Sequence, residues 1–256
     1  MRSPQSELPQ ITAELVERLR QRRPRVHCIT NAVAQTFTAN VLLALGAVPS
    51  MTISPKEVPS FIRRADALLV NLGMFDAERQ KASLAAIAAV NKLRKPWVLD
   101  PVFIDRSPPR AALARRLVAK RPAALRLNEQ EFRALGGKVA DAVASARYAA
   151  KTRTVVGLTG ERDLVSDGVR LVAIANGDPM MAKVTAMGCA GSAVVAAFLA
   201  VESDAWLATA AALIAFGVAG EVAAERSHGP GSFSVEIVDA LYALDRATLV
   251  GKAKVA

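Results

Sequence analysis

The chain has 256 residues, of which 52% are hydrophobic and 22% charged, and it carries a formal net charge of +10. This apolar composition excludes an intrinsically disordered chain, and the length suits a large α/β domain, so we expect residues 1–256 to fold as a single domain. The two cysteines, Cys28 and Cys189, are far apart in the sequence. Their spacing excludes a disulfide framework and a Cys-rich zinc site, and it is typical of a protein of the reducing cytoplasm.

The distribution of charged and apolar residues predicts no nucleic-acid partner and no membrane. Lys and Arg are scattered over expected helices, as at Arg63 and Arg64, without the stacking aromatics of a nucleic-acid site. The first 25 residues lack the apolar core of a secretory signal. The longest apolar segment, residues 205–220, contains Thr209. It is shorter than the roughly 20 residues of a membrane span, so we expect a buried helix there.

Short apolar runs alternate with amphipathic segments over the first 160 residues. The expected strands are residues 26–29, 50–53, 67–71, 97–100, 124–127 and 155–158. The expected helices are residues 11–20, 36–45, 58–64, 76–94, 110–119 and 140–151. This alternation predicts an α/β fold with a mostly parallel central sheet and helices on both faces.

The pattern changes after residue 160. Segments 163–166 and 170–175 flank Asp167-Gly168, a pair typical of a hairpin turn, so we expect a small antiparallel edge. The remaining chain predicts helices at 189–200, 204–226 and 235–244, with a loop at 228–233 between the last two.

Polar side chains follow the apolar runs, where the carboxyl ends of parallel strands would gather ligands. Asp100 and Glu131 come just after two successive strands, and oxygen ligands suit the magnesium ion that accompanies a nucleotide. A second interpretation stays open for Glu131. It is the third residue after Asn128, the spacing of a capping box at a helix start.

Gly188 and Cys189 precede an Ala-rich run, at the expected start of a buried helix. Unpaired N–H groups and the helix dipole favour anions there, and the same field would lower the pKa of the Cys189 thiol. Alternatively, Cys189 is a small core residue, as most free cysteines are. Cys28 lies within an expected strand, and we interpret it as structural.

Seven motifs follow one another over nearly the whole chain. They are VHCITN (26–31), QTFTANVLLALGA (35–47), LDPV (99–102), ALRLNEQE (124–131), LTGE (158–161), KVTAMGCAGSAV (183–194) and HGPGSF (228–233). Together they resemble the motifs of the hydroxyethylthiazole kinase family, which is ribokinase-like. The resemblance implies ATP-dependent phosphorylation of the hydroxyl of hydroxyethylthiazole, the thiazole half of thiamine. It also implies ATP and Mg²⁺ as cofactors and a homotrimer whose sites lie at subunit interfaces.

The same resemblance assigns roles to particular residues. The thiazole site would include Asn31, Val33, Met51 and Ala186, and the ATP site would include Arg126, Thr159 and Gly188. Asp100 and Glu131 would lie at the magnesium ion. Cys189 would be the catalytic residue, because it takes the place of the aspartate of most ribokinase-like enzymes and would accept or orient the proton of the substrate hydroxyl.

The chain departs from the family pattern at three places near the phosphate-handling end. It has Ala186-Met187-Gly188-Cys189 where the family usually has GTGC, Leu127 where it has the glycine of RGN, and Phe103 where it has a glycine after DPV. Met187 removes a hydroxyl that could donate to an anion. These departures leave two further functions open, a kinase for another small alcohol and a non-catalytic thiazole-binding protein, which a panel of alcohols in an ATP-consumption assay distinguishes.

Overall fold

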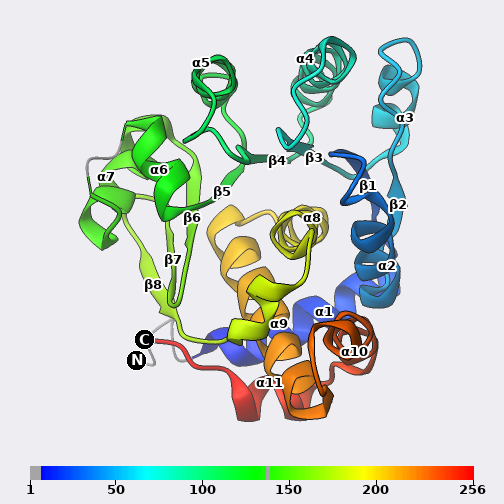
Figure 1. Cartoon of the computed structure of the whole chain (residues 1–256), viewed down its shortest axis with the longest axis vertical. Coiled ribbons are helices and arrows are strands. Elements are labelled where there is room, and N and C mark those ends of the chain that lie inside the picture. The colour runs from blue at the N-terminus through cyan, green and yellow to red at the C-terminus, as the bar shows by residue number, and fades with distance from the viewer. Residues whose placement is uncertain (1–6, 137–138) are drawn as a thin grey trace.

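The computed structural model describes residues 7–136 and 139–256, and its centre is an eight-stranded sheet (Figure 1). The strands are β1 (Arg25–Ile29), β2 (Val48–Ser50), β3 (Ala67–Asn71), β4 (Trp97–Asp100), β5 (Ala124–Asn128), β6 (Val155–Thr159), β7 (Asp163–Ser166) and β8 (Leu171–Ile174). Their order in the sheet is β2-β1-β3-β4-β5-β6-β7-β8. The first six are parallel to one another, whereas β7 and β8 pair antiparallel. The expected α/β class, the parallel sheet and the antiparallel edge are confirmed.

Helices cover both faces of this sheet, as Figure 1 shows. One face carries α3 (Val58–Arg64), α4 (Ala77–Lys92), α5 (Pro108–Val118), α6 (Glu129–Leu135) and α7 (Ala142–Thr152). The other carries α1 (Leu8–Arg22), α2 (Gln35–Leu45), α8 (Met187–Leu199), α9 (Ala205–Arg226), α10 (Pro230–Ala243) and α11 (Arg246–Lys252). A short 3₁₀ helix, η2 (Pro179–Lys183), precedes α8.

The central strands are buried on both faces, which explains why their sequences are continuously apolar. Every residue of β3 and β4 is buried. The buried side chains form two hydrophobic cores, one between the sheet and α3–α7 and the other between the sheet and the C-terminal helices. Strands covered on both sides cannot show the polar alternation of a half-exposed sheet.

Several expected boundaries were wrong, those of β2 and α10 among them. Strand β2 occupies Val48–Ser50 rather than 50–53, because only Val48, Pro49 and Ser50 pair with β1. Beyond Ser50 the carbonyl of Thr52 accepts a hydrogen bond from the His27 ring at 3.0 Å instead of joining the ladder. Helix α10 begins at Pro230, inside the segment expected to be a loop. Proline suits the first turn of a helix, since the N–H that it lacks has no intrahelical partner there.

Helix α9 has 22 residues and coincides with the helix expected at 204–226 to within one residue. By length and composition alone it could cross a membrane, but 83% of its most apolar window is buried inside the protein. Its neighbours include α8, α10 and α1. The expected buried helix is therefore confirmed, with α9 at the centre of the second core.

Candidate active site

The carboxyl ends of the parallel strands bring polar side chains from distant parts of the sequence together. Asn71 and Asp100 are the last residues of β3 and β4 and are paired in the register, as are Asn128 and Thr159 at the ends of β5 and β6. Asn31 follows β1. The edge that the sequence predicted for ligand binding therefore carries a row of amides and carboxylates.

A chain of hydrogen bonds crosses this edge from a carboxylate to a thiol. The Asn71 side-chain N–H donates to Asp100 Oδ2 at 2.7 Å, and Asn31 Nδ2 donates to Asn71 Oδ1 at 3.2 Å. Asn31 Nδ2 also lies 3.4 Å from the Cys189 sulfur. A Cβ placed on Gly73 would lie 2.5 Å from Asn31 Nδ2, so a larger residue there would displace the amides. Asn71 thus links Asp100 to the site of Cys189.

Asp100 is buried, and its pKa is well above that of a free aspartate. Burial, with the nearby negative charge of Glu131, raises the pKa of Asp100 to about 7, although Arg126, Ser192 and Asn71 act in the opposite direction. Only 3% of the residue is exposed. A carboxyl held in this state is stabilised by any cation that reaches it, which is the property expected of a metal-side ligand.

Glu131 has the capping geometry that the sequence left open. Its Oε2 accepts the backbone N–H of Asn128 at 2.9 Å, while the Asn128 side chain accepts the N–H of Glu131. Its Oε1 accepts the N–H of Phe103 at 3.0 Å. Burial nevertheless raises the pKa of Glu131. The carboxylate therefore joins the start of α6 to the loop after β4, close to Asp100.

Cys189 is the third residue of α8, at the helix start that the sequence predicted. The prediction of a lowered thiol pKa was wrong. Burial, followed by the negative charge of Asp100, raises the pKa of Cys189 to about 11 despite hydrogen bonds from Asn71 and Asn31. Desolvation outweighs the field of the helix start, because α8 packs against β1, β3 and β4. The thiol is therefore neutral at pH 7.

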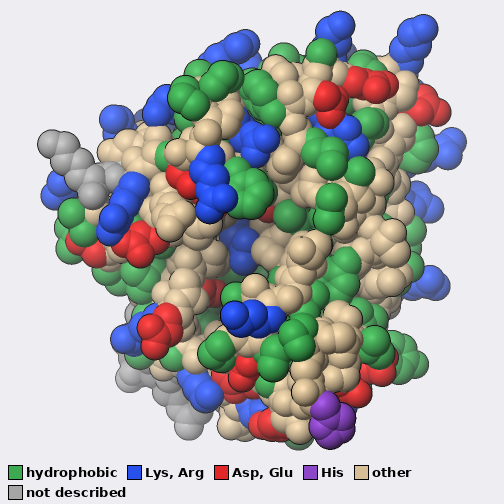
Figure 2. All heavy atoms as spheres, in the orientation of Figure 1, with side chains coloured by type: hydrophobic (Ala, Val, Ile, Leu, Met, Phe, Trp, Pro, Cys, Tyr) green, Lys and Arg blue, Asp and Glu red, His purple; other side chains and the backbone are tan. Residues whose placement is uncertain are grey.

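A pocket of about 1000 Å³ lies between the ends of β5 and β6, η2 and the start of α8. Figure 2 shows the hollow on this face. Arg126, Thr159 and Gly188, all predicted to contact ATP, line it together. The Arg126 Nε is buried and has no hydrogen-bond partner among the described residues. A cation held in this way against the N-terminus of α8 is suited to an anionic ligand.

Comparisons with a family model, with known protein sequences and with solved structures all point to one family. The family model described as "Hydroxyethylthiazole kinase family" matches residues 16–247. A probable hydroxyethylthiazole kinase of Agrobacterium fabrum is 45% identical over 95% of this chain and 94% of its own length. The hydroxyethylthiazole kinase of Granulibacter bethesdensis is 46% identical over 94% and 93%.

The chain belongs to the hydroxyethylthiazole kinase family. The solved structure of the hydroxyethylthiazole kinase protein from Pyrococcus horikoshii OT3 superposes with a TM-score of 0.93 at 37% identity, covering 96% of this chain and 98% of that chain. A ribokinase-like superfamily protein from Enterococcus faecalis, 15% identical with a TM-score of 0.68, shares the fold. The ribokinase-like fold inferred from the motifs is confirmed.

Two departures from the hydroxyethylthiazole kinase pattern share one backbone property. Ala186 has φ 69° and Phe103 has φ 58°, both in the left-handed region that glycine adopts most readily. The family usually has glycine at both places. This chain thus keeps the left-handed backbone while replacing the residue that suits it. Phe103 also contributes the N–H that Glu131 accepts, so its conformation affects the position of the Glu131 carboxylate.

The four residues expected at the thiazole lie in different surroundings. Asn31 contacts the Cys189 sulfur, and Ala186 is the N-cap of α8. Met51 follows β2 and is partly buried against the second core. Val33 lies between β1 and α2 with 64% of its surface exposed.

The sequence interpretation passed over two residues of this site. Asn71 is the last residue of β3, but nothing in the sequence showed that it would link Asp100 to Asn31. Asp163, at the start of β7, lines the large pocket, and burial raises its pKa to about 6. The sequence signal that could have identified Asp163 was its position two residues after the LTGE motif. Among the described residues, no group of three or more His, Cys, Asp or Glu could hold a metal without help from a ligand.

Proposed function

We propose that this protein transfers the terminal phosphoryl group of ATP to the hydroxyl of hydroxyethylthiazole, in the biosynthesis or salvage of thiamine. The observation that carries the proposal is the pocket of about 1000 Å³ at the N-terminus of α8. Gly188 lines this pocket, and Cys189 is the next residue along the chain. A phosphate group bound at the helix start would therefore meet the alcohol beside the thiol.

The pocket suits the polyphosphate of ATP. Arg126, with its buried unpartnered Nε, supplies positive charge, and the first N–H groups of α8 are available because no side chain caps this helix. Thr159 lies at the end of β6, with its hydroxyl donating to the Leu127 carbonyl at 3.3 Å. Phosphoryl transfer depends mainly on positioning and charge neutralisation, which these groups provide.

The carboxylates fit a magnesium ion that arrives with the nucleotide. Asp100 is the residue best suited to it, because burial and the negative charge of Glu131 raise its pKa and a bound cation would stabilise its charged form. Glu131 would support the same ion from behind, since both of its oxygens already accept backbone N–H groups. Magnesium, when bound, neutralises charge on the phosphates.

Cys189 is the proposed catalytic residue, and its protonation state restricts its role. With a pKa of about 11, the thiol holds its proton at pH 7 and orients the substrate hydroxyl rather than removing its proton. Asn31 fixes the sulfur at 3.4 Å and is itself held by Asn71. The amide pair thereby keeps the thiol and Asp100 in one arrangement.

We propose a homotrimer whose thiazole sites lie between subunits, with Asn31, Val33, Met51 and Ala186 lining them. Exposed apolar side chains support this assembly. Val33 precedes α2 and Leu43 lies on it, with 64% and 56% exposure, while Val235 and Tyr242 on the adjacent α10 have 60% and 76%. Light scattering tests the trimer, and a monomer that persists on dilution would remove both the assembly and the shared sites.

We propose the cytoplasm as the location, on the basis of the two free cysteines. The function is tested with purified protein, Mg²⁺ and ATP against hydroxyethylthiazole, hydroxymethylpyrimidine and several sugars. We expect ATP consumption with hydroxyethylthiazole at a kcat/KM at least about tenfold above every other alcohol, since a fitted polar group and ring contribute more than 1.4 kcal/mol. Preferential turnover of another alcohol, or thiazole binding without turnover, would contradict the proposal.

A further inference from the structure

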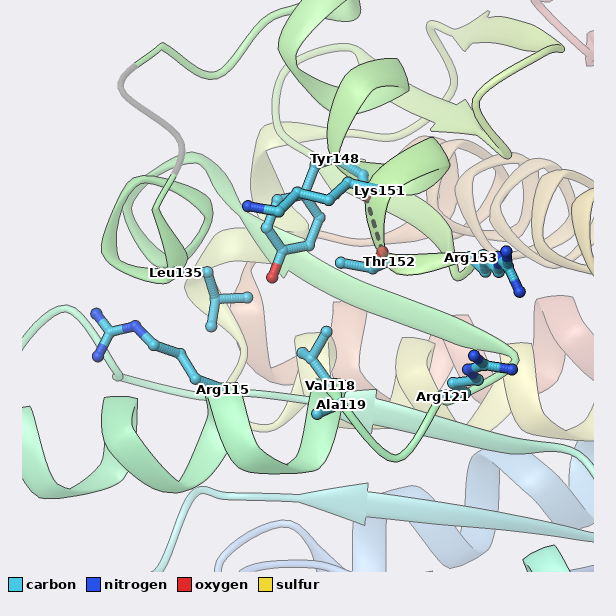
Figure 3. A pocket seen from close by; sticks show the side chains of 9 residues that line it. All are labelled: Arg115, Val118, Ala119, Arg121, Leu135, Tyr148, Lys151, Thr152 and Arg153. Carbon is cyan, nitrogen blue, oxygen red and sulfur yellow. Dashed lines mark hydrogen bonds between the residues drawn. The ribbon is translucent and has the colours of Figure 1, made fainter.

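A second pocket, of about 550 Å³, lies at the opposite edge of the sheet, near the amino ends of β5 and β6 (Figure 3). It is formed by α5, the ends of α6 and α7, and the turns that follow α5 and α7. None of its lining residues lines the pocket proposed for ATP. Its volume is in the range of small-molecule sites, so it can hold a ligand of its own.

Among the described residues, the lining of this second pocket carries four cations and no carboxylate: Arg115, Arg121, Lys151 and Arg153. Arg115 donates to the Ala134 carbonyl at 2.7 Å. The side chains of Arg121, Lys151 and Arg153 make no hydrogen bond or ion pair within the described residues. Like charges gathered without a counter-charge repel one another, and a bound anion would remove that repulsion.

The backbone brings two of these arginines together. Arg121 follows α5 and Arg153 is the C-cap of α7, with left-handed φ values of 58° and 54°. Cations at helix C-termini are favoured by the helix dipole, which explains each arginine separately. It does not explain why both line the same pocket: Figure 3 shows the two guanidinium groups at the same end of the pocket, with Arg115 at the other end.

Between these two ends the pocket is apolar and aromatic. Val118 and Leu135 form its floor, and the Tyr148 ring lies over them in Figure 3. That ring is fixed edge-on against Phe132, with the centroids 5.5 Å apart. Its hydroxyl makes no hydrogen bond within the described residues. The pocket thus combines a flat apolar surface with separated positive groups.

We propose that this pocket is a second ligand site, which binds an anion that joins an aromatic body to two or more negative charges, as a nucleotide does. Each guanidinium group can bind a phosphate through two parallel N–H donors, which fits the charged end. The apolar floor and Tyr148 accept the ring. The site is separate from the kinase pocket and does not depend on the proposed kinase activity.

The chain itself offers a site-specific probe, because it contains only two tyrosines, Tyr148 and Tyr242. Labelling with 3-fluorotyrosine gives two ¹⁹F NMR signals, one in the pocket and one on the exposed surface of α10, where Tyr242 is 76% exposed. Metal-free ATP, adenosine and inorganic phosphate are titrated separately. We expect ATP to shift the Tyr148 signal saturably and to leave the Tyr242 signal in place.

The key variant is Arg121→Asn combined with Arg153→Asn. Asparagine tolerates left-handed backbone, so both charges are removed without added strain. The matched control is Arg94→Asn, since Arg94 has the same conformation, φ 53°, after α4 and lies outside this pocket. Lys151→Gln provides a second test on a helical residue. The paired arginine variant should weaken ATP binding at Tyr148 at least about tenfold, because charge-assisted contacts contribute more than one decade in affinity.

Phosphate and adenosine should each bind at least about tenfold more weakly than ATP, because each supplies only one half of the ligand. The control Arg94→Asn should leave the Tyr148 titration unchanged, and Lys151→Gln should weaken it. A Tyr148 signal that ATP does not move would overturn the proposal. A shift that survives in the paired arginine variant would also overturn it, because the signal would then report binding in the kinase pocket. Equal affinity for phosphate and ATP would overturn it as well, because the site would then respond to negative charge alone.

Discussion

Replacing Asp100 by asparagine should stabilise the free protein while removing its activity. The carboxyl is buried, and desolvation and Glu131 raise its pKa to about 7. Asparagine has nearly the same shape, and its side-chain oxygen can still accept the 2.7 Å hydrogen bond from Asn71. The substitution therefore removes a buried charge and keeps its neighbours in place.

The sign and size of the effect follow from proton linkage. Between about pH 4 and 7 the unfolded chain releases the proton of Asp100 whereas the folded protein keeps it, so wild-type stability falls as pH rises through this range. A pKa moved from 3.8 to about 7 corresponds to roughly 4 kcal/mol, at about 1.4 kcal/mol per pH unit. The asparagine variant lacks this loss, so its advantage should be absent near pH 4 and largest above pH 7.

The assay is thermal and urea unfolding of both proteins from about pH 5 to 8, with Asp239→Asn as the control for an exposed carboxylate on α10. We expect the melting temperature of Asp100→Asn to exceed that of wild type by at least about 5 °C at pH 8, given about 2–4 °C per kcal/mol for a chain of this size. Mg²⁺ with ATP should stabilise wild type more than the variant. A variant less stable than wild type at pH 8, or a difference independent of pH, would refute this reasoning.

Five further substitutions test the phosphate end of the site. Cys189→Ala should lower turnover at least about tenfold, and Cys189→Asp should equal or exceed wild type, in rate assays from about pH 6 to 9; wild-type rates that rise along a thiol titration in this range would contradict the raised pKa of Cys189. Ala186→Gly and Phe103→Gly should each stabilise the fold by about 0.5–1 kcal/mol in urea unfolding by relieving left-handed backbone, and lower stability in both would contradict that strain. Met187→Thr should raise turnover by restoring a hydroxyl to the pocket wall, and a lower rate would mean that the thioether has become part of this site.

The sequence predicted most of the fold because its strongest signals are local. The apolar runs of β3 and β4 are buried on both faces, so a continuous apolar stretch was enough to identify them. The errors arose where the local signal was ambiguous. The segment HGPGSF contains two glycines and a proline, yet Pro230 starts a helix there because Ser232 Oγ also accepts the N–H of Gly229 at 3.2 Å.

The candidate site was predictable in position but not in chemistry. The rule that ligands gather at the carboxyl ends of parallel strands identified Asp100, and the motifs gave the expected roles of Asp100 and Thr159. The thiol pKa was predicted in the wrong direction, because a helix start is visible in the sequence whereas burial against the sheet is not. The unpartnered Nε of Arg126 likewise depends on tertiary packing that no local pattern shows.

The most direct test of the proposed function is ³¹P NMR of the purified protein with Mg²⁺, ATP and hydroxyethylthiazole, with Asp100→Asn as the control. We expect a new phosphate monoester signal on the thiazole side chain that grows in step with ADP, and no such signal with the variant at the same protein concentration. ADP and free inorganic phosphate without the monoester, or a monoester formed equally by Asp100→Asn, would contradict the phosphoryl transfer and the role of Asp100 in it.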